Sequence, residues 1–316
     1  MKRILNIGFI VLMVVGSHSM LLAEEAEDEM ILTLSDGTRY IVHPSKFLRG
    51  GPPPDGIPSI DTPRFTSVVA ADVWLDDDEL VVLIERNDVA RIYPLQILVW
   101  HEIVNDTIAG EPILVTYCPL CGSVIAFKRE IDGDPVEFGT SGRLYNSNLI
   151  MYDRKTESYW SQIGGRALVG ELTGAELEMV AAQTVFWGDW KSKLPDAEVL
   201  SRETGFSRQY GRDPYEGYEN VKGLYFPVDN LDTSLHPKTV IYGIRVDGEY
   251  KAYRETELEL LATTTDIVGT VEIEIRVDSG GSVEFINTES GAIIPFERDF
   301  WFAWAAFHPA TELFGR

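Results

Sequence analysis

Short apolar runs separated by two-residue turns dominate the chain. Residues 80–84 form one such run, Asn87-Asp88 follows it, and residues 90–93 form the next. Residues 113–117 and 124–127 are two further runs. Runs of this length, rich in β-branched residues and bounded by Asn, Asp or Gly, are typical of strands joined by hairpins. The pattern therefore predicts a β-rich α+β fold.

Two short helices are expected between the strands. Pro94 suits the first position of a helix over residues 94–103, because that position needs no backbone N–H. Thr184 suits the N-cap of a second helix, which carries Trp187 and Trp190 and ends near residue 195.

An internal repeat appears when the chain is shifted by 160 residues. The identical pairs are Ile84 and Ile244, Tyr93 and Tyr253, Leu98 and Leu258, and Asp106 and Asp266. We therefore predict that residues 80–127 and 240–286 share a strand-strand-helix-strand unit, the product of an internal duplication. The same shift places Cys118 on Asp278 and Cys121 on Gly281, so only the first copy carries a cysteine pair.

The N-terminus has the order of a secretory signal peptide. Lys2 and Arg3 precede a mostly apolar run over residues 4–15, a second apolar patch ends at Ala23, and an acidic stretch follows. This order predicts cleavage after Ala23 and export to the periplasm or the outside of the cell. Residues 4–23 are also about long enough to span a bilayer, so an uncleaved anchor is the alternative.

The chain is expected to divide into four segments. The signal peptide, residues 1–23, precedes an acidic and Pro/Gly-rich lead-in over residues 24–63. A first unit, residues 64–235, contains the cysteine pair. A second, degenerate unit, residues 236–316, is predicted to pack on the first.

The charge of the chain limits its partners. Acidic residues outnumber basic ones by 50 to 27, which gives a formal net charge of −23. Such a charge repels phosphate groups and argues against a nucleic-acid partner. We expect no membrane insertion after signal cleavage, and the expected partner is a metal ion or another protein of the cell envelope.

The chain contains only two cysteines, in the segment Cys118-Pro119-Leu120-Cys121-Gly122. Two cysteines this close together cannot form the disulfide framework of a small secreted domain. They are suited to a small disulfide loop, a redox pair or half of a metal site. Thiolates on a tight turn favour soft metals, and zinc would need further ligands, whereas copper(I) tolerates two or three. We therefore predict that Cys118 and Cys121 bind copper or zinc, with His101 as the third ligand.

The same residues also suit two alternative functions. In one, the protein is a thiol enzyme in which Cys118 or Cys121 is the nucleophile and His101 its base. In the other, it is a non-catalytic envelope module with an inert disulfide. Tyr117, Asn146 and Ser147 are expected to line a pocket beside the cysteines.

Several longer motifs resemble a family catalogued as domain of unknown function 3179. They are HEIVND (residues 101–106), TYCPLCG (116–122), FGTSG (138–142), LYNS (144–147), MYDR (151–154), SYWSQ (158–162) and FWFAWAAFHP (300–309). The resemblance covers nearly everything from residue 40 onward. It implies a common fold and a site at these motifs, and it implies no reaction. A more distant likeness connects the repeated thiol-bearing unit to the organomercurial lyases and to the copper chaperone of nitrous oxide reductase.

Overall fold

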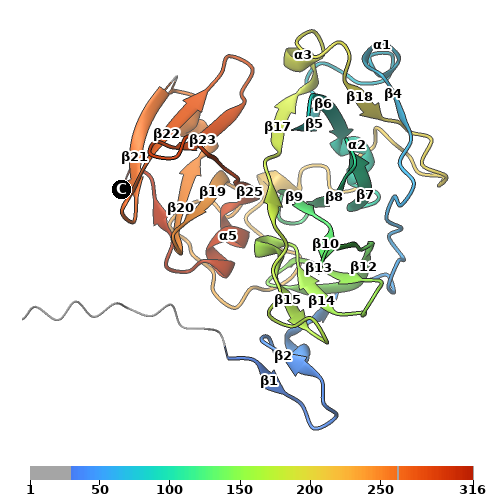
Figure 1. Ribbon diagram of the computed structural model, residues 1–316, viewed down its shortest axis with the longest axis vertical. Coiled ribbons are helices and arrows are strands. Elements are labelled where there is room, and N and C mark those ends of the chain that lie inside the picture. The colour runs from blue at the N-terminus through green and yellow to red at the C-terminus, as the bar shows by residue number, and fades with distance from the viewer. Residues whose placement is uncertain (1–29, 262, 316) are drawn as a thin grey trace, which may run out of the picture.

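The computed structural model describes residues 30–261 and 263–315, so the expected signal peptide lies outside the described residues (Figure 1). Within this part of the chain, strands predominate, and α5 (Trp301–Phe307) is the longest helix, with 7 residues. The predicted β-rich α+β class is confirmed. None of the helices in the described residues is long and apolar enough to cross a membrane.

The central sheet joins the two predicted units. Its eight strands in the described residues are β26 (Glu312–Leu313), β20 (Glu249–Arg254), β19 (Val240–Val246), β25 (Glu297–Phe300), β9 (Ser123–Lys128), β8 (Glu111–Cys118) and β7 (Ile103–Ile108), with β16 (Met179–Val180) also pairing with β9. The junction is the pairing of Arg298 in β25 with Val124 in β9. Residues 236–316 therefore share a sheet with the first unit, and the division into units stays a prediction.

Three further sheets flank the central one. The first contains β1 (Leu32–Thr33), β2 (Arg39–Tyr40), β15 (Ala167–Val169), β14 (Tyr159–Ser161), β13 (Asn148–Asp153), β12 (Phe138–Tyr145) and β3 (Leu48–Arg49). The second contains β17 (Gln183–Phe186), β5 (Leu80–Arg86), β6 (Val89–Pro94), β18 (Glu198–Leu200) and β4 (Phe65–Ser67). The third contains β21 (Thr263–Val268), β22 (Val271–Val277), β23 (Val283–Asn287) and β24 (Ile293–Ile294). A separate hairpin is made by β10 (Glu130–Ile131) and β11 (Asp134–Pro135).

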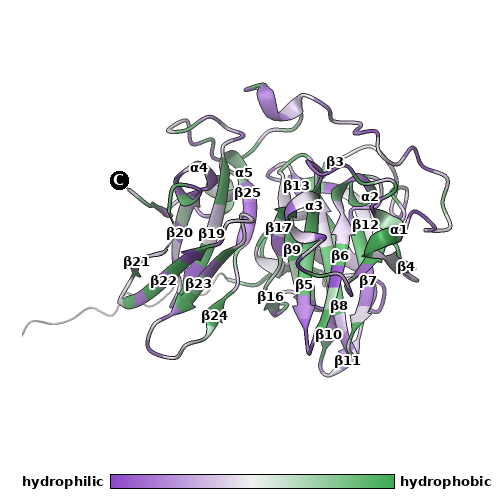
Figure 2. Cartoon of the chain, turned by 90° about the horizontal axis from the view of Figure 1, so that it is seen from above, coloured by the Kyte–Doolittle hydropathy of each residue, from purple (hydrophilic) through white to green (hydrophobic). Residues whose placement is uncertain are grey.

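The same elements recur in the two halves, which lie side by side in Figure 2. The first half contains β5, β6, α2 (Leu95–Leu98), β7, β8 and β9, and the second contains β19, β20, α4 (Glu255–Leu258), β21, β22 and β23. Each element of the second half begins 160 residues after its counterpart. The Tyr93 hydroxyl donates to Asp106 at 2.6 Å, and the Tyr253 hydroxyl donates to Asp266 at 2.8 Å. Both segments thus follow the same order of elements, and duplication as the origin of this order stays a prediction.

The correspondence between the two halves extends beyond residues 80–127 and 240–286. The succession β17, α3 (Trp187–Trp190), β18 recurs as β25, α5, β26, with each start 114 residues later. The Trp187 indole N–H donates to Asp72 at 2.9 Å, and the Trp301 indole N–H donates to Asp232 at 3.0 Å. The two offsets differ because the first half carries an insertion over residues 129–182, which supplies β12 to β15.

The predicted helix over residues 94–103 is wrong beyond its first turn. Helix α2 ends at Leu98, and Ile103 already begins β7. Glu102 has a φ of +60°, which breaks the helix, and the β-branched residues that follow pair with β8. The second helix is also shorter than predicted, because Thr184 belongs to β17 and α3 contains only Trp187–Trp190.

Candidate functional site

The cysteine pair lies on a tight turn between two strands, as the sequence predicts. Cys118 ends β8 and pairs with Ser123, the first residue of β9. The backbone N–H of Cys121 donates to the Cys118 carbonyl at 3.1 Å. Gly122 closes the turn with a φ of +61°, a conformation that glycine adopts without strain.

Both cysteines carry free, buried thiols. Cys118 is 2% exposed and Cys121 is fully buried. The Cys121 thiol donates to the Ser147 carbonyl at 3.3 Å. Burial raises the pKa of Cys121 well above its usual value, and the neighbouring Cys118 thiol raises it further. Cys121 is therefore a protonated thiol at neutral pH.

A long connection between β18 and β19, residues 201–239, packs over the cysteine turn. We call it the cover loop. Its Tyr218 belongs to the same buried cluster as Cys118 and Cys121, and Tyr215 packs against that cluster. Lys238 holds the loop in place: its ammonium group donates to the carbonyls of Val221 and Gly223 and lies 4.0 Å from the centre of the Tyr218 ring. The thiols are thus enclosed by aromatic side chains.

Two buried acids approach the turn from β25. Asp299 and Glu297 are two residues apart, so their side chains lie on the same face of the strand. Asp299 is fully buried, and neither of its carboxylate oxygens forms a hydrogen bond within the described residues. Burial raises the pKa of Asp299 to about 7, although the nearby Ser123 hydroxyl, outside standard hydrogen-bond geometry, lowers it. Burial first, and the neighbouring Asp299 second, raise the pKa of Glu297 well above its usual value.

The acids are a feature of one half only. The positions equivalent to Glu297 and Asp299 in the first half are Gln183 and Val185. The Gln183 side chain donates to the Val283 carbonyl at 2.6 Å and accepts from the Val283 N–H at 3.0 Å. A hydrogen-bonded amide and a valine thus occupy the two positions in the first half, and a pair of buried acids occupies them in the second. The sequence interpretation missed both acids, and aligning FWGDW (residues 186–190) with FWFAW (300–304) would have revealed the exchange.

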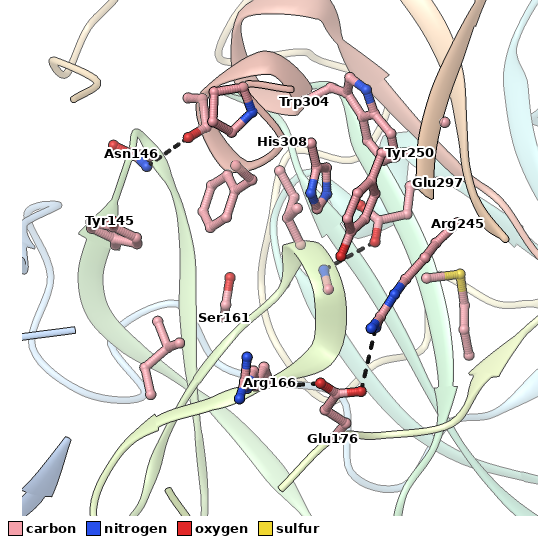
Figure 3. A pocket seen from close by; sticks show the side chains of 18 of the residues that line it. Tyr145, Asn146, Ser161, Arg166, Glu176, Arg245, Tyr250, Glu297, Trp304 and His308 are labelled. Atoms are coloured by element: carbon pink, nitrogen blue, oxygen red, sulfur yellow. Dashed lines mark hydrogen bonds and ion pairs between the residues drawn. The ribbon is translucent and has the colours of Figure 1, made fainter. Parts of the chain in front are cut away.

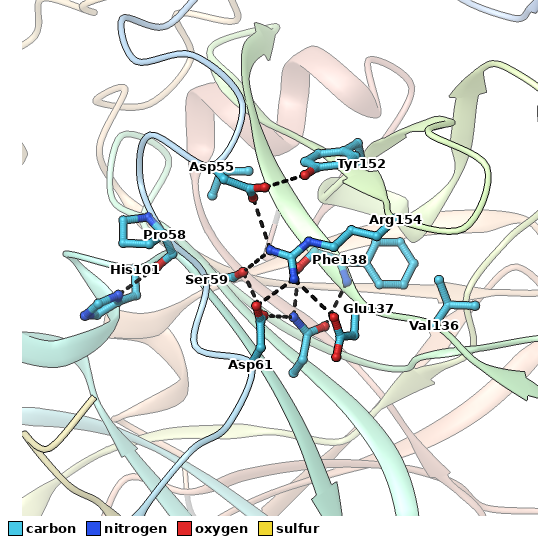
Figure 4. A network of polar contacts seen from close by, with 12 residues as sticks. Asp55, Pro58, Ser59, Asp61, His101, Val136, Glu137, Phe138, Tyr152 and Arg154 are labelled. Atoms are coloured by element: carbon cyan, nitrogen blue, oxygen red, sulfur yellow. Dashed lines mark hydrogen bonds and ion pairs between the residues drawn. The ribbon is translucent and has the colours of Figure 1, made fainter. Parts of the chain in front are cut away.

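Two hydrogen bonds engage both ring nitrogens of His101. Its Nδ1 lies 2.7 Å from the Pro58 carbonyl oxygen, and its Nε2 lies 2.7 Å from the hydroxyl of Tyr210 in the cover loop. Figure 4 shows the ring beside Pro58, near the network in which Arg154 bonds Asp55 and Asp61. Burial lowers the pKa of His101. No three His, Cys, Asp or Glu residues in the described part of the chain form a group that could hold a metal, so His101 and the cysteines do not form one.

The three residues expected to line a pocket take different positions. Asn146 and Ser147 have φ values of +47° and +63° and form the two-residue turn between β12 and β13. Ser147 contacts Cys121 through its carbonyl, as described above. Asn146 lines a cavity of about 540 Å³, which Glu297 also lines (Figure 3). Tyr117 lies in β8, where its N–H donates to the Glu102 carbonyl at 2.8 Å.

A third buried acid, Glu102, lies close to the cysteine strand. Glu102 is 8% exposed, and burial raises its pKa to about 8. Burial first, and the charge of Glu102 second, raise the pKa of Tyr215 in the cover loop. The site therefore combines two thiols, buried acids with raised pKa values and tyrosines in a shell with little access to water.

Comparison with known proteins identifies a family and no individual relative. A comparison with curated proteins and one with solved structures gave no match. The family described as "Protein of unknown function (DUF3179)" matches residues 54–297, which contain the cysteine turn, His101 and the insertion. The chain belongs to this family.

Proposed function

We propose that the protein binds a soft metal ion, copper(I) in preference to zinc, through the thiolates of Cys118 and Cys121. The observation that carries the proposal is the arrangement of two free thiols on one turn beside the buried carboxyl of Asp299. Copper(I) is favoured because soft thiolate ligands select it and the turn supplies two of them. Zinc prefers four ligands. His101 is left out of the ligand set, because hydrogen bonds hold both of its ring nitrogens.

Asp299 supplies the proton acceptor that such a site needs. A metal binds thiolates, so the thiol protons must leave on binding. The carboxylate of Asp299 neighbours Cys121 and influences its pKa. With a pKa of about 7, Asp299 can take one of these protons at neutral pH. The buried site then gains less net charge than if both protons left for solvent.

Export places this activity in the cell envelope. This part of the proposal rests on the basic start, the apolar run and the acidic stretch that follow one another in the first 29 residues.

A thiol enzyme is the second candidate, and the same carboxyl supports it. Asp299, in place of His101, would accept the proton of the nucleophilic cysteine. The two functions differ in the cysteines that they require. Metal binding needs both thiols, whereas the activity of a thiol enzyme needs only the nucleophilic one.

Titration of the reduced protein with copper(I) in competition with a colorimetric chelator tests the proposal. We expect one equivalent to bind, and Cys118→Ser and Cys121→Ser each to abolish binding. Asp278→Ser is the matched control, because Asp278 occupies the position of Cys118 in the second half. At pH 8 the wild type should release about one proton fewer per copper than Asp299→Asn, because Asp299 takes up one proton. Binding that survives in the double cysteine variant would overturn the proposal.

A further inference from the structure

The cavity of about 540 Å³ lies between the insertion and the second half of the chain. Residues of β14 and β15 line one side, and residues of β19, β20 and α5 line the other (Figure 3). Its volume falls in the range of roughly 300–1,000 Å³ that is typical of small-molecule sites. None of the proposed metal ligands lines it, so its occupant is a separate question.

One wall of the cavity is aromatic and is held against the backbone. The rings of Tyr250 and His308 are stacked, with 4.0 Å between their centres. The Trp304 ring centre lies 4.2 Å from that of His308, and the indole N–H donates to the Thr311 hydroxyl at 2.9 Å. A Cβ atom at Gly243 would collide with the Trp304 ring, so the indole lies directly against β19. A wall fixed in this way suits a flat ligand ring, because little order is lost when the ring binds.

The charged side chains of the cavity are already engaged. Glu176 lies 3.6 Å from Arg245 and 3.8 Å from Arg166, and Arg166 has a further interaction. Burial lowers the pKa of His308 to about 3, so this imidazole is neutral at neutral pH. Burial also raises the pKa of Glu297 well above its usual value, which favours the protonated acid. Among the described residues that line the cavity, a charged ligand group would find no uncommitted opposite charge, and burying it would be costly.

Buried polar atoms without partners lie in the same cavity. Ser161 is 2% exposed, and its side chain points into the cavity (Figure 3). Its Oγ forms no hydrogen bond within the described residues, and neither do Glu297 Oε2 and His308 Nε2. The other carboxyl oxygen of Glu297 accepts from the Gly164 N–H at 3.0 Å, so the proton of this acid is available on Oε2. Since buried polar atoms are normally paired, a ligand oxygen that accepts hydrogen bonds would satisfy the hydroxyls of Ser161 and Glu297.

We propose that this cavity binds an uncharged aromatic carbonyl compound. Its ring packs against Tyr250, His308 and Trp304. Its carbonyl oxygen accepts a hydrogen bond from the Ser161 hydroxyl, with the Glu297 carboxyl as the second donor. The proposal does not depend on metal binding by the cysteines, because neither cysteine lines the cavity.

Isothermal titration of the protein with 2-naphthamide and with 2-naphthoate tests this inference, because the two probes share a ring and differ in charge. At neutral pH we expect naphthamide to bind at least about tenfold more tightly, because burying a carboxylate without a counter-ion is costly. Ser161→Ala should weaken naphthamide binding by about three- to tenfold, the contribution of one neutral hydrogen bond. The urea midpoint of this variant should be unchanged, because Ser161 Oγ bonds nothing within the described residues.

Ser123→Ala is the matched control. Ser123 is also buried, and its hydroxyl also forms no hydrogen bond within the described residues, but Ser123 does not line the cavity. Its loss should therefore leave naphthamide binding unchanged. Naphthoate binding at least as tight as that of naphthamide, an equal effect of both serine variants, or no binding of naphthamide at millimolar concentration would overturn the proposal.

Discussion

The backbone N–H of Phe300 donates a hydrogen bond of 2.7 Å to the carbonyl oxygen of Cys121. This bond fastens the end of β25 to the cysteine turn, and Asp299 is the residue immediately before it. The ring of Phe300 also covers Gly122, where a Cβ atom would lie 2.9 Å from the nearest ring carbon. The turn and the acid-bearing strand therefore form one rigid contact, on which the proposed chemistry depends.

Gly122→Ala should destabilise the protein more than Gly281→Ala. Both glycines have a positive φ, so alanine costs about 1–2 kcal/mol of unfolding free energy at each. Only Gly122 would also place its Cβ against Phe300, which adds about 1–3 kcal/mol. Urea denaturation of the two variants measures the difference. Equal losses of unfolding free energy in the two variants would show that the Phe300 ring moves aside and that the contact is not rigid.

Asp299→Asn should change how stability depends on pH. The folded pKa of Asp299 is raised from 3.8 to about 7, so between these values the folded state holds a proton that the unfolded state has lost. The wild type therefore loses stability as the pH rises from about 4 to 7, by up to about 4 kcal/mol from this group. Asparagine removes this loss, so the variant gains stability relative to the wild type over that range.

Urea midpoints measured from pH 4 to pH 8 check this expectation. Asp278→Asn serves as the control with the opposite sign, because hydrogen bonds lower the pKa of Asp278 despite its partial burial. At neutral pH, Asp278→Asn should be less stable than the wild type, because it lacks the ionised carboxylate that stabilises the fold. The wild type loses this stabilisation only as the pH falls through the lowered pKa of Asp278. Parallel plots of stability against pH for the wild type and Asp299→Asn would contradict a raised pKa of the buried Asp299 carboxyl.

Much of this architecture could be predicted from the sequence, because strands and hairpin turns depend on local patterns. The turns at Asn87-Asp88 and at residues 118–122 follow from such patterns and are confirmed. The helix over residues 94–103 was wrong because its β-branched end pairs with β8, a contact between neighbouring strands that outweighs a local signal. Asp299 could not be predicted as part of the site, since it lies 178 residues after Cys121 and reaches it only through the pairing of β25 with β9.

Lys238→Met should expose the thiols. Lys238 is 5% exposed and ties the cover loop through two backbone carbonyls and the Tyr218 ring. Methionine keeps the apolar stem and loses these bonds, so the loop opens more often and a thiol reagent should label the cysteines about tenfold faster. Lys222→Met, a change at an exposed lysine of the same loop, is the control and should leave the labelling rate unchanged. Equal labelling rates for the two variants would show that Lys238 does not hold the loop.

His101→Ala should separate a role in folding from a role in metal binding. His101 joins Pro58 to Tyr210 of the cover loop, so its loss should lower the unfolding free energy by about 1–3 kcal/mol. Copper(I) affinity should change by less than about threefold, because both ligands remain in place. Denaturation and chelator competition on the same preparation measure the two effects. A loss of affinity of about tenfold or more would restore His101 as a ligand.

Elemental analysis of the protein purified from the cell envelope, its proposed location, tests the central claim most directly. The wild type should contain one copper ion per chain, and the variant carrying Cys118→Ser and Cys121→Ser, purified in parallel, should contain none. A wild type without copper or zinc, or a double variant that retains the metal, would contradict metal binding by the cysteine pair.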